Sequence, residues 1–438
     1  MKTKLIRLTT VPISLKVLLK GQHQFMSSKG FEVIGVSSAG AELDEVHKTE
    51  GIRIVPIEMS RKITPIADIK SLWQTYQFFK KEKPQIVHTH TPKAGIVGML
   101  AAKLAGVPIR LHTVAGLPLM EASGNKRKVL DFVEKLTYNC ATRVYPNSKG
   151  LYDFILTHQY TSEDKLKVIG NGSSNGIDTS FFSKDKISID VQQNLKKELK
   201  ITPSDFVFIF VGRLVGDKGI NELVKAFKGL GSRDLGSGIW EQEVGSREQG
   251  AGSREQGAGN RDQGVGIWKQ GSGNEDWKEN NSSAKLLLVG PLESDLDPLQ
   301  PETLEEINSN PNIISVGFQK DVRPYFAVSD ALVFPSYREG FPNVVMQAGA
   351  MGLPSIVSNI NGCNEIIVEG QNGTIIPVKD AEAIYKAMEK MMNDQSYYTS
   401  LQVNSRPMIQ SRYEQSLVWN ALLEEYDRLV AGTLGIRD

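Results

Sequence analysis

Cysteine is almost absent from this chain of 438 residues, which contains only Cys140 and Cys363. Two cysteines so far apart in the sequence cannot build a disulfide framework or a structural zinc cluster. Long apolar runs are also missing. The N-terminal stretch is interrupted by Arg7 and Lys16 and therefore lacks the core of a signal peptide, and the most apolar later stretch contains Lys103 and is too short to span a bilayer. We expect a cytoplasmic protein that can visit a membrane surface without crossing it.

Charge of one sign does not dominate either, since the net charge is +1, but the two halves of the chain differ. Residues 1–180 hold 25 Lys and Arg against 15 Asp and Glu, whereas the remainder holds 26 against 35. A basic half beside an acidic half predicts that the first half meets an anionic partner, such as a membrane surface. The alternative is a set of solvated lysines scattered over the surface.

Short β-branched runs alternate with helical stretches through most of the chain, which predicts an α/β protein with parallel sheets covered on both faces. Strands are expected at 4–10, 31–38, 53–57, 85–90, 109–114, 143–148, 166–172, 206–213, 284–291, 313–318, 331–336 and 354–358. Helices are expected at 67–83, 94–105, 125–140, 219–230, 301–308, 321–328 and 343–351. The alternation restarts after about residue 190, and the length suits two domains.

We therefore predict two tandem, doubly wound, Rossmann-like domains that face a cleft, with ligands bound beyond the carboxyl ends of the strands. The first domain is expected at 1–190 and the second at 191–410. A C-terminal helix within 411–438 is expected to cross back to the first domain. Residues 231–283 repeat "GSREQGA" and are rich in Gly, Ser, Gln and Glu. This composition predicts a disordered surface insertion, and its two Gly-Ile-Trp triplets leave a recognition element as the alternative.

A candidate phosphate site follows the strand "FVFIFV". Arg213 leaves this strand, and Lys218 stands directly before Gly219, where the next helix begins. A planar guanidinium fork, a mobile ammonium and a helix N-terminus together suit phosphate oxygens. The alternative is a glycine-bounded loop with two solvated cations.

A second candidate site lies in "YREGFPNVVMQAGAMG". Pro342 suits the first turn of a helix, so the N–H groups of Asn343 and Val344 are free for an anion. Glu339 precedes this helix and can accept hydrogen bonds from sugar hydroxyls, while Gln347 points back toward the same turn. The alternative is a helix cap beside an exposed acid.

His88 and His90 flank Thr89 at a predicted strand end, which would suit a metal only with further ligands beside them. The neighbouring sequence supplies none, so we interpret both histidines as polar residues that line or support the cleft.

The order of several motifs resembles that of the retaining GT-B glycosyltransferases of the family 4 group. The motifs are "VGRLVGDKGI", "LLLVGP", "VGFQKDV", "ALVFPSYREGFPNVVMQAGAMGLPSIVS" and "GCNEIIVEGQNG", with "VHTHTPKAGIVGMLAAKLAGVPIRLHTVAG", "VYPNSKG" and "GNGSSNGID" in the first half. The resemblance covers nearly the whole chain apart from the insertion. It is strongest to bacterial members that build capsule, exopolysaccharide or lipid-linked oligosaccharide.

This resemblance implies transfer of a hexose or N-acetylhexosamine from a nucleotide-diphosphate sugar to a glycan or polyprenyl-diphosphate-linked acceptor, and we expect the nucleotide to be UDP. It implies no metal or other cofactor, no nucleic-acid partner, and peripheral contact with the cytoplasmic face of the inner membrane. The implied catalytic residues are Glu339, His112, Arg213 and Lys218.

The resemblance also implies that the donor contacts Arg213, Lys218, Gly317, Phe318, Glu339, Gly340, Phe341, Pro342, Asn343, Val344 and Gln347. On the acceptor side we expect Lys16, His90, Lys93 and Asn147.

Two positions depart from the family pattern. Gln347 stands where the family has a second glutamate, and a neutral amide offers a ribose diol one acceptor and one donor in place of two charged acceptors. The first loop also lacks the glycine pair that the family often has after its first strand, so no role is carried over to it. A non-hydrolysing UDP-sugar 2-epimerase and an inactive scaffold protein of the same fold stay as alternatives.

Overall fold

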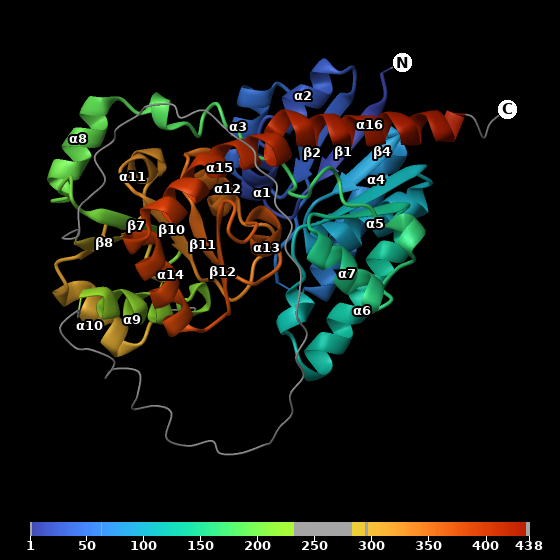
Figure 1. The fold of residues 1–438 in the computed structure, drawn as a ribbon. Coiled ribbons are helices and arrows are strands. Elements are labelled where there is room, and N and C mark those ends of the chain that lie inside the picture. Colours follow the sequence, from blue (N-terminus) through green and yellow to red (C-terminus); the bar gives the residue numbers. More distant parts are fainter. Residues whose placement is uncertain (1, 63, 232–282, 294–296, 435–438) are drawn as a thin grey trace, which may run out of the picture.

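The computed structural model describes residues 2–62, 64–231, 283–293 and 297–434 (Figure 1). The predicted insertion at 231–283 lies almost wholly outside the described residues. Two sheets of six parallel strands form the centres of the two halves of the molecule. The prediction of an α/β protein with two doubly wound parallel sheets is therefore confirmed.

The first sheet has the strand order β3-β2-β1-β4-β5-β6. Its strands are β1 (Lys4–Leu8), β2 (Glu32–Ser37), β3 (Arg53–Pro56), β4 (Ile86–Thr89), β5 (Ile109–Val114) and β6 (Arg143–Pro146). Its helices are α1 (Pro12–Leu18), α2 (Gln22–Ser28), α3 (Ala41–Glu50), α4 (Pro65–Glu82), α5 (Pro92–Ala105), α6 (Gly124–Cys140) and α7 (Lys149–Thr157). The connections cross over through these helices, which cover both faces of the sheet in Figure 1.

The second sheet repeats the plan in the order β12-β11-β10-β7-β8-β9. Its strands are β7 (Phe206–Val211), β8 (Ala284–Val289), β9 (Ile313–Ser315), β10 (Ala331–Phe334), β11 (Ser355–Ser358) and β12 (Gly373–Ile376). Helix α8 (Ile189–Glu198) precedes it, and its own helices are α9 (Ile220–Gly231), α10 (Pro301–Ser309), α11 (Arg323–Ala327), α12 (Asn343–Ala350), α13 (Cys363–Ile366), α14 (Ala381–Asn393) and α15 (Gln395–Tyr413). Strand β7, "FVFIFV", is apolar at every position because helices bury both of its faces.

Helix α5 shows how local sequence places a site residue. It carries Gly95 and Gly98 where it crosses the first sheet. A Cβ atom at Gly95 would lie 2.6 Å from the ring of His112, and one at Gly98 would lie 2.5 Å from the side chain of Leu8. The two glycines therefore let α5 lie directly on the sheet and close over the histidine.

The last helix, α16 (Gln415–Leu434), joins the two halves. It follows α15 of the second half and runs along the first (Figure 1). The hydroxyl of Tyr426 accepts a hydrogen bond of 3.0 Å from Arg7 on β1. Glu425 accepts one of 2.6 Å from Lys167 and one of 3.1 Å from the hydroxyl of Tyr145. Buried polar contacts therefore fix the C-terminal helix to the first sheet.

Two sequence-based predictions of strands differ from the structure. The segment 166–172 forms no strand: Leu166 makes an isolated bridge with Val144, and Gly170 and Gly172 then take positive φ angles of 57° and 98°, which turn the chain away from the sheet. Strand β12 was not expected, because "GTII" is short and begins with a glycine. Its register beside β11 supplies the pairing that its sequence does not announce.

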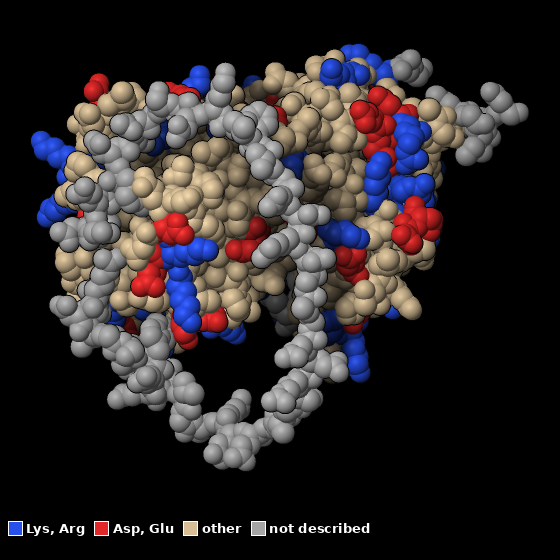
Figure 2. All heavy atoms as spheres, viewed as in Figure 1, with Lys and Arg blue, Asp and Glu red and all other residues tan. Residues whose placement is uncertain are grey.

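None of the described helices is long and apolar enough to cross a bilayer. On the face drawn in Figure 2, blue and red side chains lie side by side over the first half of the molecule. The positive charge of residues 1–180 is therefore not gathered into one uniform patch on this face.

Candidate functional site

A cleft of about 800 Å³ opens between the two sheets. From the first half, it is lined by residues at the ends of β4 and β5, including His90, which follows β4, and His112, which belongs to β5. From the second half, it is lined by residues that follow β7 and β10, including Arg213, Lys218 and Glu339. All of these residues lie at or just beyond the carboxyl ends of parallel strands, where doubly wound sheets bind their ligands.

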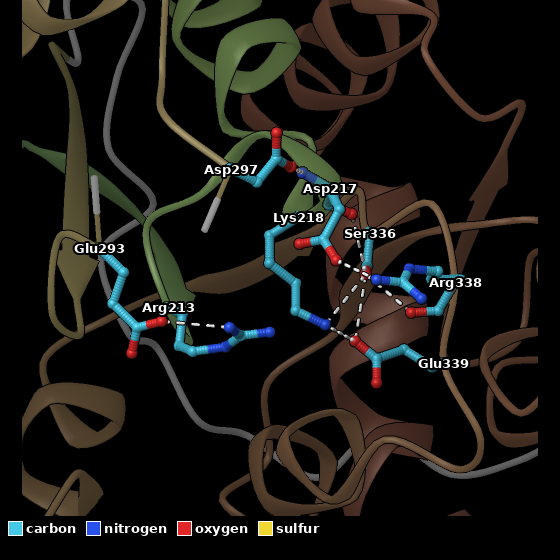
Figure 3. A network of polar contacts seen from close by, with 8 residues as sticks. All are labelled: Arg213, Asp217, Lys218, Glu293, Asp297, Ser336, Arg338 and Glu339. Carbon is cyan, nitrogen blue, oxygen red and sulfur yellow. Dashed lines mark hydrogen bonds and ion pairs between the residues drawn. The ribbon is translucent and has the colours of Figure 1, made fainter. Parts of the chain in front are cut away.

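Lys218 and Glu339 form the centre of a polar network in this cleft (Figure 3). The Lys218 Nζ lies 2.5 Å from the Glu339 Oε1, and the hydroxyl of Ser336 donates to the same oxygen at 3.1 Å. Both charged side chains are less than a fifth exposed, so solvent screens the pair only in part. The other carboxylate oxygen, Oε2, meets no donor in the described part of the chain. One oxygen thus positions the carboxylate, and the other is available to a ligand.

A close backbone contact holds the loop of Lys218, which follows β7, against the end of β10. Gly219 follows Lys218 with φ of 71°, and a Cβ atom there would lie 2.2 Å from the carbonyl oxygen of Pro335. Only glycine fits this approach and this backbone angle. The loop after β7 is thereby held against the loop that carries Glu339.

Two further ion pairs surround this centre (Figure 3). Arg213 Nη1 lies 3.1 Å from Glu293 Oε2, and Arg338 Nη2 lies 2.9 Å from Asp217 Oδ2. The Arg213 side chain is 42% exposed, so its pair with Glu293 contributes little to stability and leaves the guanidinium able to turn toward an anion. Of these residues, sequence analysis identified Arg213 alone.

The two halves touch directly at the loop that contains Glu339 and Gly340, which we call the glutamate loop. A Cβ atom at Gly340 would lie 1.9 Å from the carbonyl oxygen of Ala115, so the backbone after β5 rests on the backbone after β10. Asn361 spans the same contact: its Nδ2 donates to the carbonyls of Gly340 at 2.5 Å and of Glu339 at 3.3 Å, and its Oδ1 accepts from Ser148 at 2.8 Å. Asn361 and Ser336 were missed by sequence analysis, although both come just after a strand, which is the signal that could have found them.

A second cross-contact reinforces this one. The carboxylate of Glu365 accepts hydrogen bonds from the N–H groups of Lys149 at 2.7 Å and Gly150 at 3.1 Å. These N–H groups open α7, so an acid of the second half caps a helix of the first. The position of the glutamate loop is therefore coupled to the closeness of the two halves.

Helix α12 places the remaining predicted donor contacts. The N–H groups of Asn343 and Val344 open this helix and meet no acceptor within the described ranges. Pro342 is buried, and the ring of Phe341 packs edge-on against Tyr413 at 5.4 Å between centroids. These residues lie beside the cleft, and only the neighbouring Gly340 lines it.

Gln347 lies one turn further along α12 and is half-buried, and the cleft lining does not include it. Gly317 and Phe318 follow β9 at the same edge of the second sheet, beyond the cavity. Gly317 has φ of 64°, its carbonyl accepts from Gly290 at 2.9 Å, and the Phe318 ring is 75% exposed.

His88, His90 and His112 of the first half are buried, and burial lowers the pKa of each. Burial lowers the pKa of His112 to about 4, and its Nδ1 lies 2.7 Å from the hydroxyl of Thr89. Burial and the nearby Arg7 hold the pKa of His88 well below its ordinary value. The two ring nitrogens of His88 contact the hydroxyls of Tyr426 at 2.6 Å and Thr113 at 2.8 Å. His88 is thus a structural residue, while His112 lines the cleft.

His90 differs from its neighbours because neither of its ring nitrogens has a hydrogen-bond partner among the described residues. Its ring is 4% exposed, lies 4.1 Å from that of His88 between centroids, and lines the cleft. A buried imidazole without partners carries a desolvation cost that a bound ligand can relieve. This is an independent indication that the first-half side of the cleft receives a polar ligand.

The other residues expected on the acceptor side do not line the cleft. Lys16 forms an ion pair with Glu45 on the surface, and Lys93 forms one with Asp68, where both residues line a neighbouring groove. Asn147 lines a small cavity behind His90, where its Oδ1 has no partner in the described part of the chain.

Glu134 of α6 also lines the cleft, although sequence analysis did not single it out. It is 7% exposed, and burial raises its pKa to about 7. Its position in the middle of a helix, rather than at a strand end, gave no signal in the sequence.

No group of three or more His, Cys, Asp or Glu side chains in the described ranges is arranged to hold a metal ion. Positive charge in the cleft comes from Arg213, Lys218 and Arg338, and the N-terminus of α12 lies beside it.

Comparison with known proteins identifies the family. A glycosyl transferase 4-like domain matches residues 26–172, and the glycosyl transferases group 1 match residues 275–394. The capsular polysaccharide biosynthesis glycosyltransferase CapM of Staphylococcus aureus is 31% identical over 432 residues, which cover 99% of this chain and 99% of CapM. The chain belongs to the group 1 glycosyltransferases. The glycosyltransferase assignment made from the motifs is confirmed, and both matching family models favour it over the epimerase alternative.

Two further likenesses extend this result. The UDP-Gal:alpha-D-GlcNAc-diphosphoundecaprenol alpha-1,3-galactosyltransferase of Escherichia coli is 28% identical, covering 77% of this chain and 73% of that protein. The structure of Anabaena HepE in complex with UDP and glucose superposes with a TM-score of 0.71 at 15% identity, covering 97% of this chain and 100% of HepE. At that identity the likeness shows the fold, which is GT-B.

Proposed function

We propose that this glycosyltransferase moves a hexose or N-acetylhexosamine from a UDP-sugar to a glycan carried on a polyprenyl diphosphate, with retention of anomeric configuration and without a metal. The observation that carries the proposal is the meeting of Lys218, Glu339 and Arg213 from the second half with His112 from the first in one cleft. A cationic group, a sugar-binding acid and an acceptor-facing wall are the parts that such a transfer needs.

The donor is bound from the second half. The diphosphate lies against Lys218, Arg213 and the N–H groups of Asn343 and Val344, which supply the positive charge that a metal supplies elsewhere. The free Oε2 of Glu339 accepts hydrogen bonds from sugar hydroxyls, while Lys218 and Ser336 hold its Oε1. The base and ribose extend toward Phe318 and Gln347.

The transfer itself breaks the bond between the anomeric carbon and the β-phosphate oxygen. The acceptor oxygen attacks from the same face, and its proton passes to the departing phosphate oxygen. Lys218 and Arg213 stabilise the negative charge that develops on the leaving diphosphate. His112, neutral because burial lowers its pKa to about 4, lines the opposite wall and offers a hydrogen bond without a competing positive charge.

The acceptor class is supported by the relatives. The E. coli relative acts, by its name, on a diphosphoundecaprenol-linked sugar, and a relative from Campylobacter jejuni is named for a diphospho-undecaprenol substrate as well. CapM is named for capsular polysaccharide biosynthesis. An acceptor anchored in a bilayer requires peripheral contact of the enzyme with the cytoplasmic face of the inner membrane.

The test is a panel of UDP-sugars and GDP-sugars incubated with a lipid-linked acceptor extract, with nucleotide release and glycolipid products measured. We expect that one of the UDP-sugars releases UDP and that it does so only when the acceptor is present. An epimerised donor formed without acceptor would instead favour the 2-epimerase. Unchanged glycan assembly when Glu339→Ala replaces the wild type in cells would favour a scaffold protein.

A further inference from the structure

The first half of the molecule carries a second cavity next to the cleft, a groove between α4, α5 and α6. Helix α5 forms its floor through Ile96 and Leu100, and α4 and α6 form its walls through Leu72 and Leu130. Its volume is about 900 Å³, as large as the cleft itself. Nine of its nineteen lining residues are Leu, Ile or Val and its surface is mostly apolar, so the groove suits an apolar ligand.

Large apolar side chains are exposed on the two helices that form the walls, and two of them, Ile69 and Val129, line the groove itself. On α4, Ile66, Ile69 and Trp73 are 88%, 68% and 60% exposed, and on α6 Val129 and Phe132 are 51% and 67% exposed. The spacing of three and four residues places those on α4 on one helical face. A helix that faces water normally presents polar residues there, so this surface is built to be covered.

Cations gather at one end of the groove. Arg61 and Lys62 follow β3, and Lys126 lies in the first turn of α6, after β5. All three line the groove at the carboxyl edge of the first sheet, which is the edge that faces the cleft. Within the described ranges none of the three pairs with a carboxylate, so their charges are available to an anion.

The groove and the cleft are continuous. Thr91, Pro92 and Glu134 line both cavities. A ligand with a long apolar chain, an anionic link and a polar end can therefore lie with the chain between α4 and α6, the link at the cationic end and the polar end in the cleft.

We propose that this groove holds the isoprenoid chain of the lipid-diphosphate acceptor and that Arg61, Lys62 and Lys126 bind its diphosphate. The inference rests on the proposed function and deepens it, because it assigns the acceptor lipid to a specific surface. The three features that carry it are the aliphatic groove, the unpaired cations at its cleft end and the shared lining with the cleft. Charge complementarity favours a lipid diphosphate over a neutral apolar segment of another protein.

The test uses the full chain saturated with UDP and farnesyl diphosphate as the probe, with binding followed by calorimetry. Ile69→Glu places a carboxylate at the mouth of the groove and should weaken the probe about tenfold or more, because that charge would have to lose its hydration beside the chain. Val403→Glu is the matched control, since Val403 of α15 is 67% exposed against 68% for Ile69 and lies in the other half. It should leave the affinity unchanged.

Inorganic diphosphate should bind about tenfold or more weakly than the probe, because it lacks the chain, and should be insensitive to Ile69→Glu. Equal affinity of the probe for wild type and Ile69→Glu would overturn the inference, and so would binding of the probe that occurs only when UDP is left out. Vesicles that lack any diphosphate lipid provide the last arm: if Ile69→Glu lowers their binding while leaving the probe unaffected, the face is a general membrane contact and the inference is wrong. Failure of the wild type to bind UDP would contradict the proposed function and not the groove.

Discussion

The charge of Glu339 is the feature of the cleft whose removal has the most definite expected consequence. In Glu339→Gln the shape of the side chain is kept, but the ion pair with Lys218 at 2.5 Å becomes a hydrogen bond to a neutral oxygen. The amide NH2 group then takes the place of the free Oε2, which we assign to the donor sugar, so a charged acceptor becomes a neutral donor. Both changes act on the same transition state, because the first loosens the group that binds the leaving diphosphate and the second weakens the hold on the sugar.

The magnitude follows from these two contacts. A hydrogen bond to a charged group contributes about 1.5–3 kcal/mol and a neutral one about 0.5–1.5 kcal/mol, so each contact loses on the order of 1 kcal/mol or slightly more. Two such losses correspond to a fall of about 30- to 100-fold in kcat/KM, since about 1.4 kcal/mol is a factor of ten. Most of the loss should appear in kcat, because Lys218 acts most strongly on the departing phosphate.

The assay is acceptor-dependent release of UDP at several donor concentrations. Glu424→Gln is a matched control, because this acid lies exposed on α16, away from the cleft, and should leave kcat/KM unchanged. A loss of less than about threefold in Glu339→Gln would refute the reasoning, since it would mean that neither contact strengthens in the transition state.

Three further outcomes are expected. Gln347→Ala should raise the donor KM by about fivefold with little change in kcat, because a lost neutral hydrogen bond is worth about 1 kcal/mol, and a collapse of kcat instead would reverse its role with that of Glu339. Asn361→Ala should lower kcat/KM by about tenfold through loss of the bridge to the glutamate loop while UDP affinity is kept, whereas Asn364→Ala, on exposed surface nearby, should be silent. Burial raises the pKa of Glu134 from 4.5 to about 7, so the native protein retains a proton that the unfolded chain releases between these values, and the contribution of this group to stability falls as the pH rises through that window. Glu134→Gln should therefore raise the free energy of unfolding by on the order of 3 kcal/mol at about pH 8, which appears as a higher melting temperature, and should leave the melting temperature unchanged at about pH 4. A lower melting temperature at about pH 8 would contradict this.

The strand pattern of this protein was largely predictable, because its strands are buried on both faces and are bounded by clear turns. The runs "FVFIFV" and "AKLLLV" have no other reasonable interpretation, and β7 and β8 lie where they were expected. The prediction of a strand at 166–172 was wrong because this short segment contains β-branched residues, as a strand would. Only the positive φ angles of Gly170 and Gly172 show that the chain leaves the sheet.

Three residues at the centre of the candidate site were singled out from the local sequence, Arg213 after a strand and Lys218 and Glu339 before helices, whereas His112 came from the family resemblance. What the sequence could not reveal was the partner of each group. The contact of Lys218 with Glu339 joins residues 121 positions apart, and Asn361 meets Ser148 across 213 positions. Such pairings depend on how two sheets face each other, and no local pattern encodes that.

The acceptor side was the least predictable part. Lys16 and Lys93 carry charge in the right half of the chain, yet each is held by an acid that the fold brings beside it. Glu134 lines the cleft from the middle of a helix, and only the packing of α6 brings it there. The spacing of Ile66, Ile69 and Trp73, by contrast, is visible in the sequence, but their exposure and the groove beside them appear only in the structure.

The most direct test of the central claim is acceptor-dependent UDP release by the wild type, measured with a set of UDP-sugars and a polyprenyl-diphosphate-linked acceptor extract. The account predicts that one UDP-sugar is consumed, that the sugar appears on the lipid-linked glycan with its anomeric configuration retained, and that chelating divalent metals leaves the rate unchanged. Inversion of configuration, or a rate that disappears on chelation and returns with added metal, would contradict it.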